Sequence, residues 1–146
     1  NWDGGDAAAL VGRVFDLSLG AFARNAFYKP ITREAFLDLY RPVIPAIDDR
    51  FVLFARVASG DIAGFLFAYP NVFDGPSPTT LVIKTYASAV KGGGRAMLDA
   101  VHQNARRHGF THAIHALMHV DNISRERSQR QGGEVFRRYA LMGRML

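Results

Sequence analysis

The chain has 146 residues, of which 49% are hydrophobic and 21% are charged, a balance typical of one globular domain rather than of a disordered segment. It contains no cysteine, which excludes disulfide bonds and thiolate chemistry within this sequence. No apolar run reaches the ~18 residues that a membrane-spanning helix needs, and no signal-peptide pattern is present. We therefore expect a soluble, cytoplasmic protein.

The formal net charge of the chain is +5. Such a charge either serves solubility or attracts a polyanion, which would be a nucleic acid or a phosphate-rich cofactor. The basic residues form two local groups, Lys91–Arg95 and Arg125–Arg138, rather than one basic helix. The sequence also lacks a basic sheet pattern studded with aromatic residues, so we expect a phosphate-bearing cofactor and no nucleic acid.

Apolar spacing and turn signals predict, in chain order, two helices, a hairpin, a third strand, a helix, a fourth strand, a helix and a last strand. Asp6 and Thr32 have the residue types that cap the first two helices. The predicted ranges are helices 7–24 and 33–41, strands 51–57, 62–69 and 80–86, helix 95–108, strand 111–119, helix 123–131 and strand 135–142. This order is no regular strand–helix alternation, so it favours a mixed sheet, with one parallel crossover over 80–119.

The run Lys91-Gly92-Gly93-Gly94-Arg95 lies between the third strand and the helix that follows it. Glycines let backbone N–H groups converge on a ligand, and the helix start adds unpaired amides and a positive dipole end. The loop therefore either cradles a pyrophosphate or serves as a plain flexible turn. It contains neither a P-loop signature nor a dinucleotide-binding fingerprint.

The stretch 89–94 (AVKGGG) resembles the cofactor motif (Q/R)-x-x-G-x-(G/A) of the GNAT N-acetyltransferases, with Ala89 in place of Gln or Arg. Other stretches resemble this family in the same order, namely Ala63-Gly64-Phe65, Arg106–Phe110, Asp121–Ser124 and Gly132-Gly133. The resemblance runs from about residue 15 to 144. Residues 25–32 also resemble a GNAT subgroup whose domains can belong to longer chains.

The resemblance implies one α/β domain over residues 1–146, of the α+β type, with a mixed central sheet, flanking helices and splayed parallel strands. It also implies acetyl-CoA as co-substrate and no metal, with direct attack by a primary amine on the thioester. The cofactor residues that it assigns are Lys84, Thr85, Tyr86, Ala87, Lys91, Gly92, Gly93, Gly94, Arg95, Asn122 and Ser124. For Ser124, a helix-capping role is the alternative.

The general acid is the point at which the chain departs from the family. Many members carry a tyrosine seven residues after the asparagine, where this chain has Gln129, which cannot donate an acidic proton. The remaining candidates for acid or base are Ser128, Tyr139 and His119. The departure leaves open a second function, that of a non-catalytic acyl-CoA-binding or sensory domain.

Histidines at positions 112, 115 and 119 could suggest a metal site. On a strand, however, His115 and His119 would share one face and His112 would lie on the other, so we expect no metal there. The expected partner is a small-molecule or peptide amine, with no membrane; a homodimer remains open.

Overall fold

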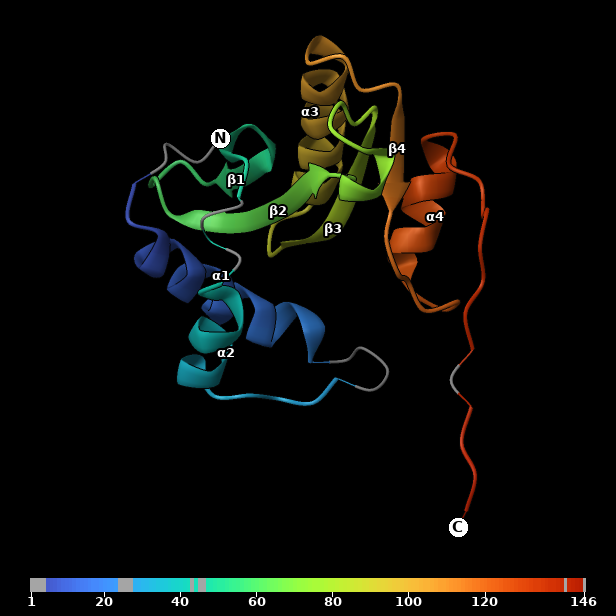
Figure 1. Cartoon of the computed structure of the whole chain (residues 1–146). Helices are drawn as coiled ribbons and strands as arrows, with labels where there is room; N and C mark the ends of the chain where they lie inside the picture. The colour runs from blue at the N-terminus through green and yellow to red at the C-terminus, as the bar shows by residue number, and fades with distance from the viewer. Residues whose placement is uncertain (1–4, 24–27, 43, 45–46, 141, 146) are drawn as a thin grey trace.

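The computed structural model describes residues 5–23, 28–42, 44, 47–140 and 142–145. Helices α1 (Ala7–Phe22) and α2 (Arg33–Tyr40) cover one face of a four-stranded sheet, and α3 (Gly93–Arg107) covers the other (Figure 1). Helix α4 (Ile123–Arg130) lies beside the last strand. This arrangement confirms the predicted α/β fold with a mixed sheet between helices.

The sheet has the order β1-β2-β3-β4. Strands β1, β2 and β3 pair antiparallel, and β3 and β4 pair parallel. The strands are β1 (Val52–Arg56), β2 (Ile62–Pro70), β3 (Thr80–Ser88) and β4 (His112–His115). The parallel pair is connected through α3, as the predicted crossover requires.

The first two helices begin where their capping residues predict. The Asp6 carboxylate accepts a hydrogen bond from the Ala9 amide at 3.0 Å, and the Thr32 hydroxyl accepts one from the Ala35 amide at 3.2 Å. Each bond satisfies an amide that the helix itself leaves unpaired. Helix α1 contacts the sheet, and the ring of Phe36 on α2 packs against Phe15 of α1.

The α3 side of the sheet holds the main hydrophobic core. Leu66, Leu81, Leu98 and Val101 are fully buried there. On the other side, Phe15 of α1 packs against the α2 aromatic residues. The sheet is therefore apolar on both faces, which fixes the helices on either side of it.

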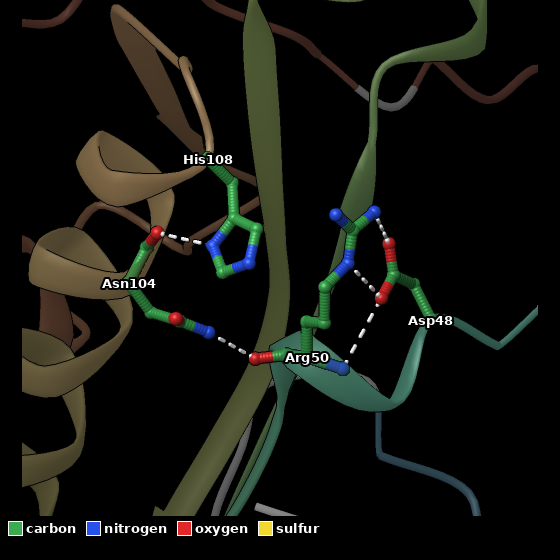
Figure 2. A network of polar contacts seen from close by, with 4 residues as sticks. All are labelled: Asp48, Arg50, Asn104 and His108. Atoms are coloured by element: carbon green, nitrogen blue, oxygen red, sulfur yellow. Dashed lines mark hydrogen bonds and ion pairs between the residues drawn. The ribbon is translucent and has the colours of Figure 1, made fainter.

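Polar contacts join the C-terminal end of α3 to the start of β1 (Figure 2). The Asp48 carboxylate accepts hydrogen bonds from Nε and Nη2 of Arg50 at 2.8 and 2.6 Å. Asn104 of α3 donates to the Arg50 carbonyl, and its own carbonyl lies 2.8 Å from Nδ1 of His108. The hydrogen bond from Arg50 is the main reason that the pKa of Asp48 is lowered.

Two predicted strands differ from the structure. Strand β4 ends at His115 rather than at residue 119, and no strand forms among the described residues of 135–142, so that prediction was wrong. A strand exists only where a second strand pairs with it. Here α4 lies alongside the four-residue β4, and the chain after α4 runs away from the sheet (Figure 1).

Candidate functional site

The parallel strands β3 and β4 separate after a short paired stretch. Their last pair is Ile83 with His115, and the Ala116 amide still donates to the Ile83 carbonyl at 3.0 Å. Beyond this point the chain turns away at Leu117, which has φ of +40°. The remaining residues of β3, 84–88, pair with β2 alone, so one edge of their backbone faces a gap.

A β-bulge marks the point of separation. Phe67 of β2 pairs with Thr85, but the next residue, Ala68, pairs with Ile83, which leaves Lys84 as the extra residue of β3. A bulge reverses the alternation of side chains along a strand. As a result, Ile83 and Tyr86, three residues apart, both pack against the core on the α3 side.

A cavity of about 450 Å³ opens on the α1–α2 side and reaches the gap between the strands. Lys84, Thr85 and Tyr86 contribute to its lining from β3, and His115 and Asn122 contribute from the other side of the gap. Its remaining walls carry the aromatic residues Phe15, Phe22, Tyr28, Phe36, Tyr40 and Phe65. The cavity thus combines an apolar wall with backbone groups of two diverging strands.

The glycine run forms a tight turn at the other end of the gap. Gly92 has φ of +84°, a conformation that side chains other than glycine adopt with strain. A Cβ on Gly93 would lie 2.4 Å from Oγ of Ser88, so only glycine fits there without a shift of that side chain. Helix α3 begins at Gly93, two residues earlier than predicted, so Gly93 and Gly94 belong to its first turn.

The first turn of α3 begins with two backbone amides that no described part of the chain satisfies, one of them on the buried residue Gly94. The amides of Gly94 and Arg95 donate no hydrogen bond among the described residues. Lys91 and Arg95 are exposed, and the Arg95 side chain forms a 3.7 Å ion pair with Asp99 at the surface. Together, open amides and basic side chains form an anion-binding geometry.

Two further side chains meet at this turn. A Cβ on Gly94 would lie 3.4 Å from Nη1 of Arg127, which belongs to α4, and 3.4 Å from the ring of Tyr86. Arg127 forms no ion pair within the described chain, and the hydroxyl of Tyr86 is buried with no hydrogen-bond partner there. The sequence placed Arg127 only in a diffuse basic group; the fold brings it to the glycine turn.

The residues expected to act as acid or base lie in three different places. Ser128 is buried on the inner face of α4 and its hydroxyl lies 2.5 Å from Nδ1 of His115. His119 lies beyond the end of β4, partly exposed, with Nδ1 3.5 Å from the Asp121 carboxylate. Tyr139 is 71% exposed in the extended C-terminal segment. Among the described residues, Ser128 is the one of these three whose side chain is hydrogen-bonded to a side chain of a cavity-lining residue, His115.

Asn122 and Ser124 occupy the start of α4. The side chain of Asn122 accepts a hydrogen bond from the Ser124 amide at 2.9 Å, so Asn122 rather than Ser124 caps the helix. Gln129, at the position where GNAT enzymes often carry tyrosine, is exposed on the outer face of α4.

The sequence reasoning missed His102, which lies on α3. Its Nε2 is 3.0 Å from Nε2 of His115, and the two rings stack with centroids 5.2 Å apart. Burial, followed by the charge of His102, lowers the pKa of His115 to about 4. Burial and then the charge of Arg106 lower the pKa of His102, against a smaller opposing effect of Asp99.

His115 and His119 do not share a strand face as predicted, because β4 ends between them. Among the residues that the structure describes, no group of three or more His, Cys, Asp or Glu side chains could hold a metal ion. None of the described helices is long and apolar enough to cross a membrane.

The sequence matches no protein-family model and no curated protein. Solved structures are similar over nearly the whole chain. An aminoglycoside acetyltransferase from an uncultured soil metagenomic sample has 17% identity and a TM-score of 0.62, with 96% of this chain and 90% of that chain covered. The ribosomal-protein-alanine N-acetyltransferase from Brucella melitensis biovar Abortus 2308 has 16% identity and a TM-score of 0.63, with 94% of both chains covered.

A third solved structure is AAC(6′)-Iy in complex with the bisubstrate analog CoA-S-monomethyl-acetylneamine, with 15% identity and a TM-score of 0.61. The similarity covers 94% of this chain and 93% of that chain. The chain has the GNAT fold. The GNAT fold accounts for the mixed sheet and for the parallel pair that separates after Ile83.

Proposed function

We propose that the chain binds acetyl-CoA across the gap between β3 and β4 and transfers the acetyl group to a primary amine. The observation that carries this proposal is the free β3 edge over residues 84–88, which leads directly to the glycine turn and the open first turn of α3. An extended ligand can pair with such an edge as an added strand would. Its anionic end then reaches the helix amides.

The residues at the glycine turn fit a diphosphate. The amides of Gly94 and Arg95 are free to donate, and Gly92 and Gly93 allow the close approach of a phosphate oxygen. The family's Gln or Arg is Ala89 in this chain, but the guanidinium of Arg127 reaches the same turn from α4. Arg127 thus supplies, from a different element, a positive side chain in place of the one that Ala89 does not provide.

The thioester would lie where the strands separate. The backbone of residues 84–87 pairs with the pantetheine arm, and one of its amides polarises the thioester carbonyl. The Asn122 side chain, at the opposite wall of the cavity, is placed to contact the same arm. Acetyl-CoA supplies the activated acetyl group, so no nucleophilic side chain is required of the protein.

The cavity on the α1–α2 side is the acceptor site in this proposal. Its aromatic walls exclude water, and exclusion of water favours the neutral form of an amine, which is the form that attacks. The similar solved structures carry names that refer to aminoglycosides and to a ribosomal protein. The acceptor screen should therefore include small amines as well as peptide N-termini.

A thermal-shift titration tests the proposal. Acetyl-CoA should raise the melting temperature by mass action, equivalent to about 2.7 kcal/mol at a ligand concentration one hundred times Kd. CoA release over a panel of amines then measures transfer. Absence of any shift with acetyl-CoA or CoA would refute the proposed site.

The second candidate function is a non-catalytic acyl-CoA-binding domain. Gln129 favours it, because that side chain is exposed and cannot serve as an acid. In this case acetyl-CoA would still stabilise the fold, but no amine in the panel would accelerate CoA release.

A further inference from the structure

Three side chains from three elements form a continuous hydrogen-bonded chain next to the gap. Nε2 of His102 on α3 lies 3.0 Å from Nε2 of His115 on β4. Nδ1 of His115 lies 2.5 Å from the Ser128 hydroxyl on α4, and that hydroxyl lies 3.0 Å from the Ser124 carbonyl. Ser128 is buried, and His102 and His115 are half-buried.

The proton positions in this chain follow from the donors available. A hydroxyl has one proton, and a neutral imidazole has one N–H and one acceptor nitrogen. When Ser128 donates to the Ser124 carbonyl, His115 must donate from Nδ1 to Ser128, and His102 must donate from Nε2 to His115. In the opposite arrangement Ser128 donates to His115 and His115 donates to His102, and the hydrogen bond from Ser128 to the Ser124 carbonyl is given up. The series of hydrogen bonds therefore has two proton arrangements, and each proton moves by one hydrogen bond between them.

Burial, followed by neighbouring positive charge, lowers the pKa of both histidines and leaves both rings neutral near pH 7. Asp99 and Arg106 flank His102 on α3, and no carboxylate faces His115 among the groups that perturb it. Protons can consequently move through neutral tautomers without the cost of a buried charge.

The hydrogen-bonded side chains of His102, His115 and Ser128 lie beside the point at which β3 and β4 separate. His115 is the last residue of β4 that pairs with β3, so it marks the apex at which the two strands separate. Ser128 is held against it by α4, the helix that also brings Arg127 to the glycine turn. A ligand that runs from the glycine turn along the free edge of β3 therefore ends beside His115, which lines the cavity and is hydrogen-bonded to the buried Ser128.

We propose that Ser128 donates the proton to the leaving sulfur of the thioester, and that His115 and His102 restore this proton. The proposal depends on the acyl transfer proposed above. It supplies, from a serine and two histidines, the acid that Gln129 cannot provide. Ser128 is the catalytic residue in this scheme, and the histidines are positioning residues that act through it.

The atoms balance as follows. The amine nitrogen forms a bond to the carbonyl carbon, the C–S bond breaks with its electron pair on sulfur, and the amine loses a proton to solvent. Sulfur takes the proton of the Ser128 hydroxyl, and Oγ takes one from Nδ1 of His115. Nε2 of His115 takes the proton from Nε2 of His102, and Nδ1 of His102, on a half-buried ring, takes one from solvent.

The test measures the ionisation of the thiol of bound CoA and needs no acceptor. The protein contains no cysteine but has five tyrosines, so the ultraviolet absorbance of the thiolate is taken as the difference between the CoA and desulfo-CoA complexes, which removes the tyrosinate contribution. A donor aimed at sulfur stabilises the thiolate and lowers the thiol pKa. In Ser128→Ala we expect the ionisation constant of bound CoA to fall on the order of tenfold, a rise of about one pKa unit.

Two variants accompany this substitution. His102→Phe keeps the stacked ring but removes the nitrogen atoms, so it should raise the thiol pKa by less than Ser128→Ala does. Gln131→Ala is the matched control, because it removes a different contact with α3, the 2.8 Å hydrogen bond from the residue after α4 to Asp99, and leaves the hydrogen bonds of His102, His115 and Ser128 intact. Its thiol pKa should equal that of the wild type.

Desulfo-CoA separates this role from simple anchoring of α4. Ser128→Ala should weaken binding of CoA thiolate at high pH while leaving the affinity for desulfo-CoA unchanged. An unchanged thiol pKa in Ser128→Ala, or an equal loss of affinity for both ligands, would overturn the relay while acetyl-CoA binding stands. Lack of CoA binding by the wild-type protein would instead refute the proposed function itself.

Discussion

Arg127 has an unusual position for a basic residue on a polar surface helix. The other two arginines of α4 have nearby partners: Arg130 pairs with Glu126 at 3.6 Å, and Arg125 donates to the Val120 carbonyl at 3.2 Å. The guanidinium of Arg127 instead lies beside Gly94, as does the ring of Tyr86, and the Gly94 amide has no partner among the described residues. At the scale of one residue, this geometry favours an anion as the missing partner.

Arg127→Ala should therefore weaken CoA binding about tenfold, because one charge-assisted hydrogen bond to phosphate is lost. Pantetheine, which lacks the diphosphate, should bind both proteins equally. Isothermal titration calorimetry with both ligands measures the difference. Arg130→Ala is the control, since that arginine is exposed and paired within α4, and an equal effect of both substitutions would mean that only net charge matters.

At the scale of elements, α3 depends on contacts at both of its ends. Its N-terminal turn packs against β3, where Gly93 lies close to Ser88. Its C-terminal turn is joined to the start of β1 through Asn104 and Arg50 (Figure 2). The C-terminal contacts hold the helix in place, so its open N-terminal turn stays next to the gap.

Asp48→Asn should destabilise the protein by about 1 kcal/mol or less at pH 7, since the ion pair with Arg50 is partly exposed. Because the pKa of Asp48 is lowered from 3.8 in the folded state, its contribution is fully present well above pH 3.8 and is lost as the pH falls through the lowered value. The wild type and the variant should then converge in acid. Urea unfolding at several pH values measures this, and a difference that persists in acid would contradict the assignment.

At the scale of the whole molecule, the chain after α4 stands apart from the rest. Its described residues from 134 onward are exposed, including the large apolar side chains of Val135, Phe136 and Tyr139. A segment that buries little apolar surface contributes little to stability. The folded body therefore consists of the four-stranded sheet, the helices on its two faces and α4 at its edge (Figure 1).

A chain that ends at Glu134 should consequently unfold with a free energy within about 0.5 kcal/mol of the full chain. Its affinity for CoA should also be retained. Denaturant unfolding and calorimetry of the two chains make the comparison. A large loss of stability would show that the segment packs on the molecule in solution.

Short-range sequence signals were sufficient to predict much of the fold. Asp6 and Thr32 mark helix starts that the structure confirms, and the turn at Gly60 separates the two hairpin strands as predicted. These features depend on neighbours a few residues away, so the sequence shows them directly. The glycine turn was found in the same way, although α3 begins earlier than expected.

Strand pairing between segments that are distant along the chain could not be predicted from such short-range signals. The end of β4 at His115 depends on where β3 separates from it, and the absence of a strand over the described residues of 135–142 depends on the lack of a partner edge. For the same reason His102 and Arg127 were not singled out. Each acquires its place through a residue on another element, His115 in one case and Gly94 in the other.

The sequence by itself determined the helices, the hairpin, the mixed sheet and the glycine turn, because capping, apolar period and backbone freedom act over short distances. The tertiary structure decided where the parallel strands part and which side chains gather there. These are outcomes of packing between elements that are distant along the chain, and they depend on the bulge at Lys84 and on the position of α4.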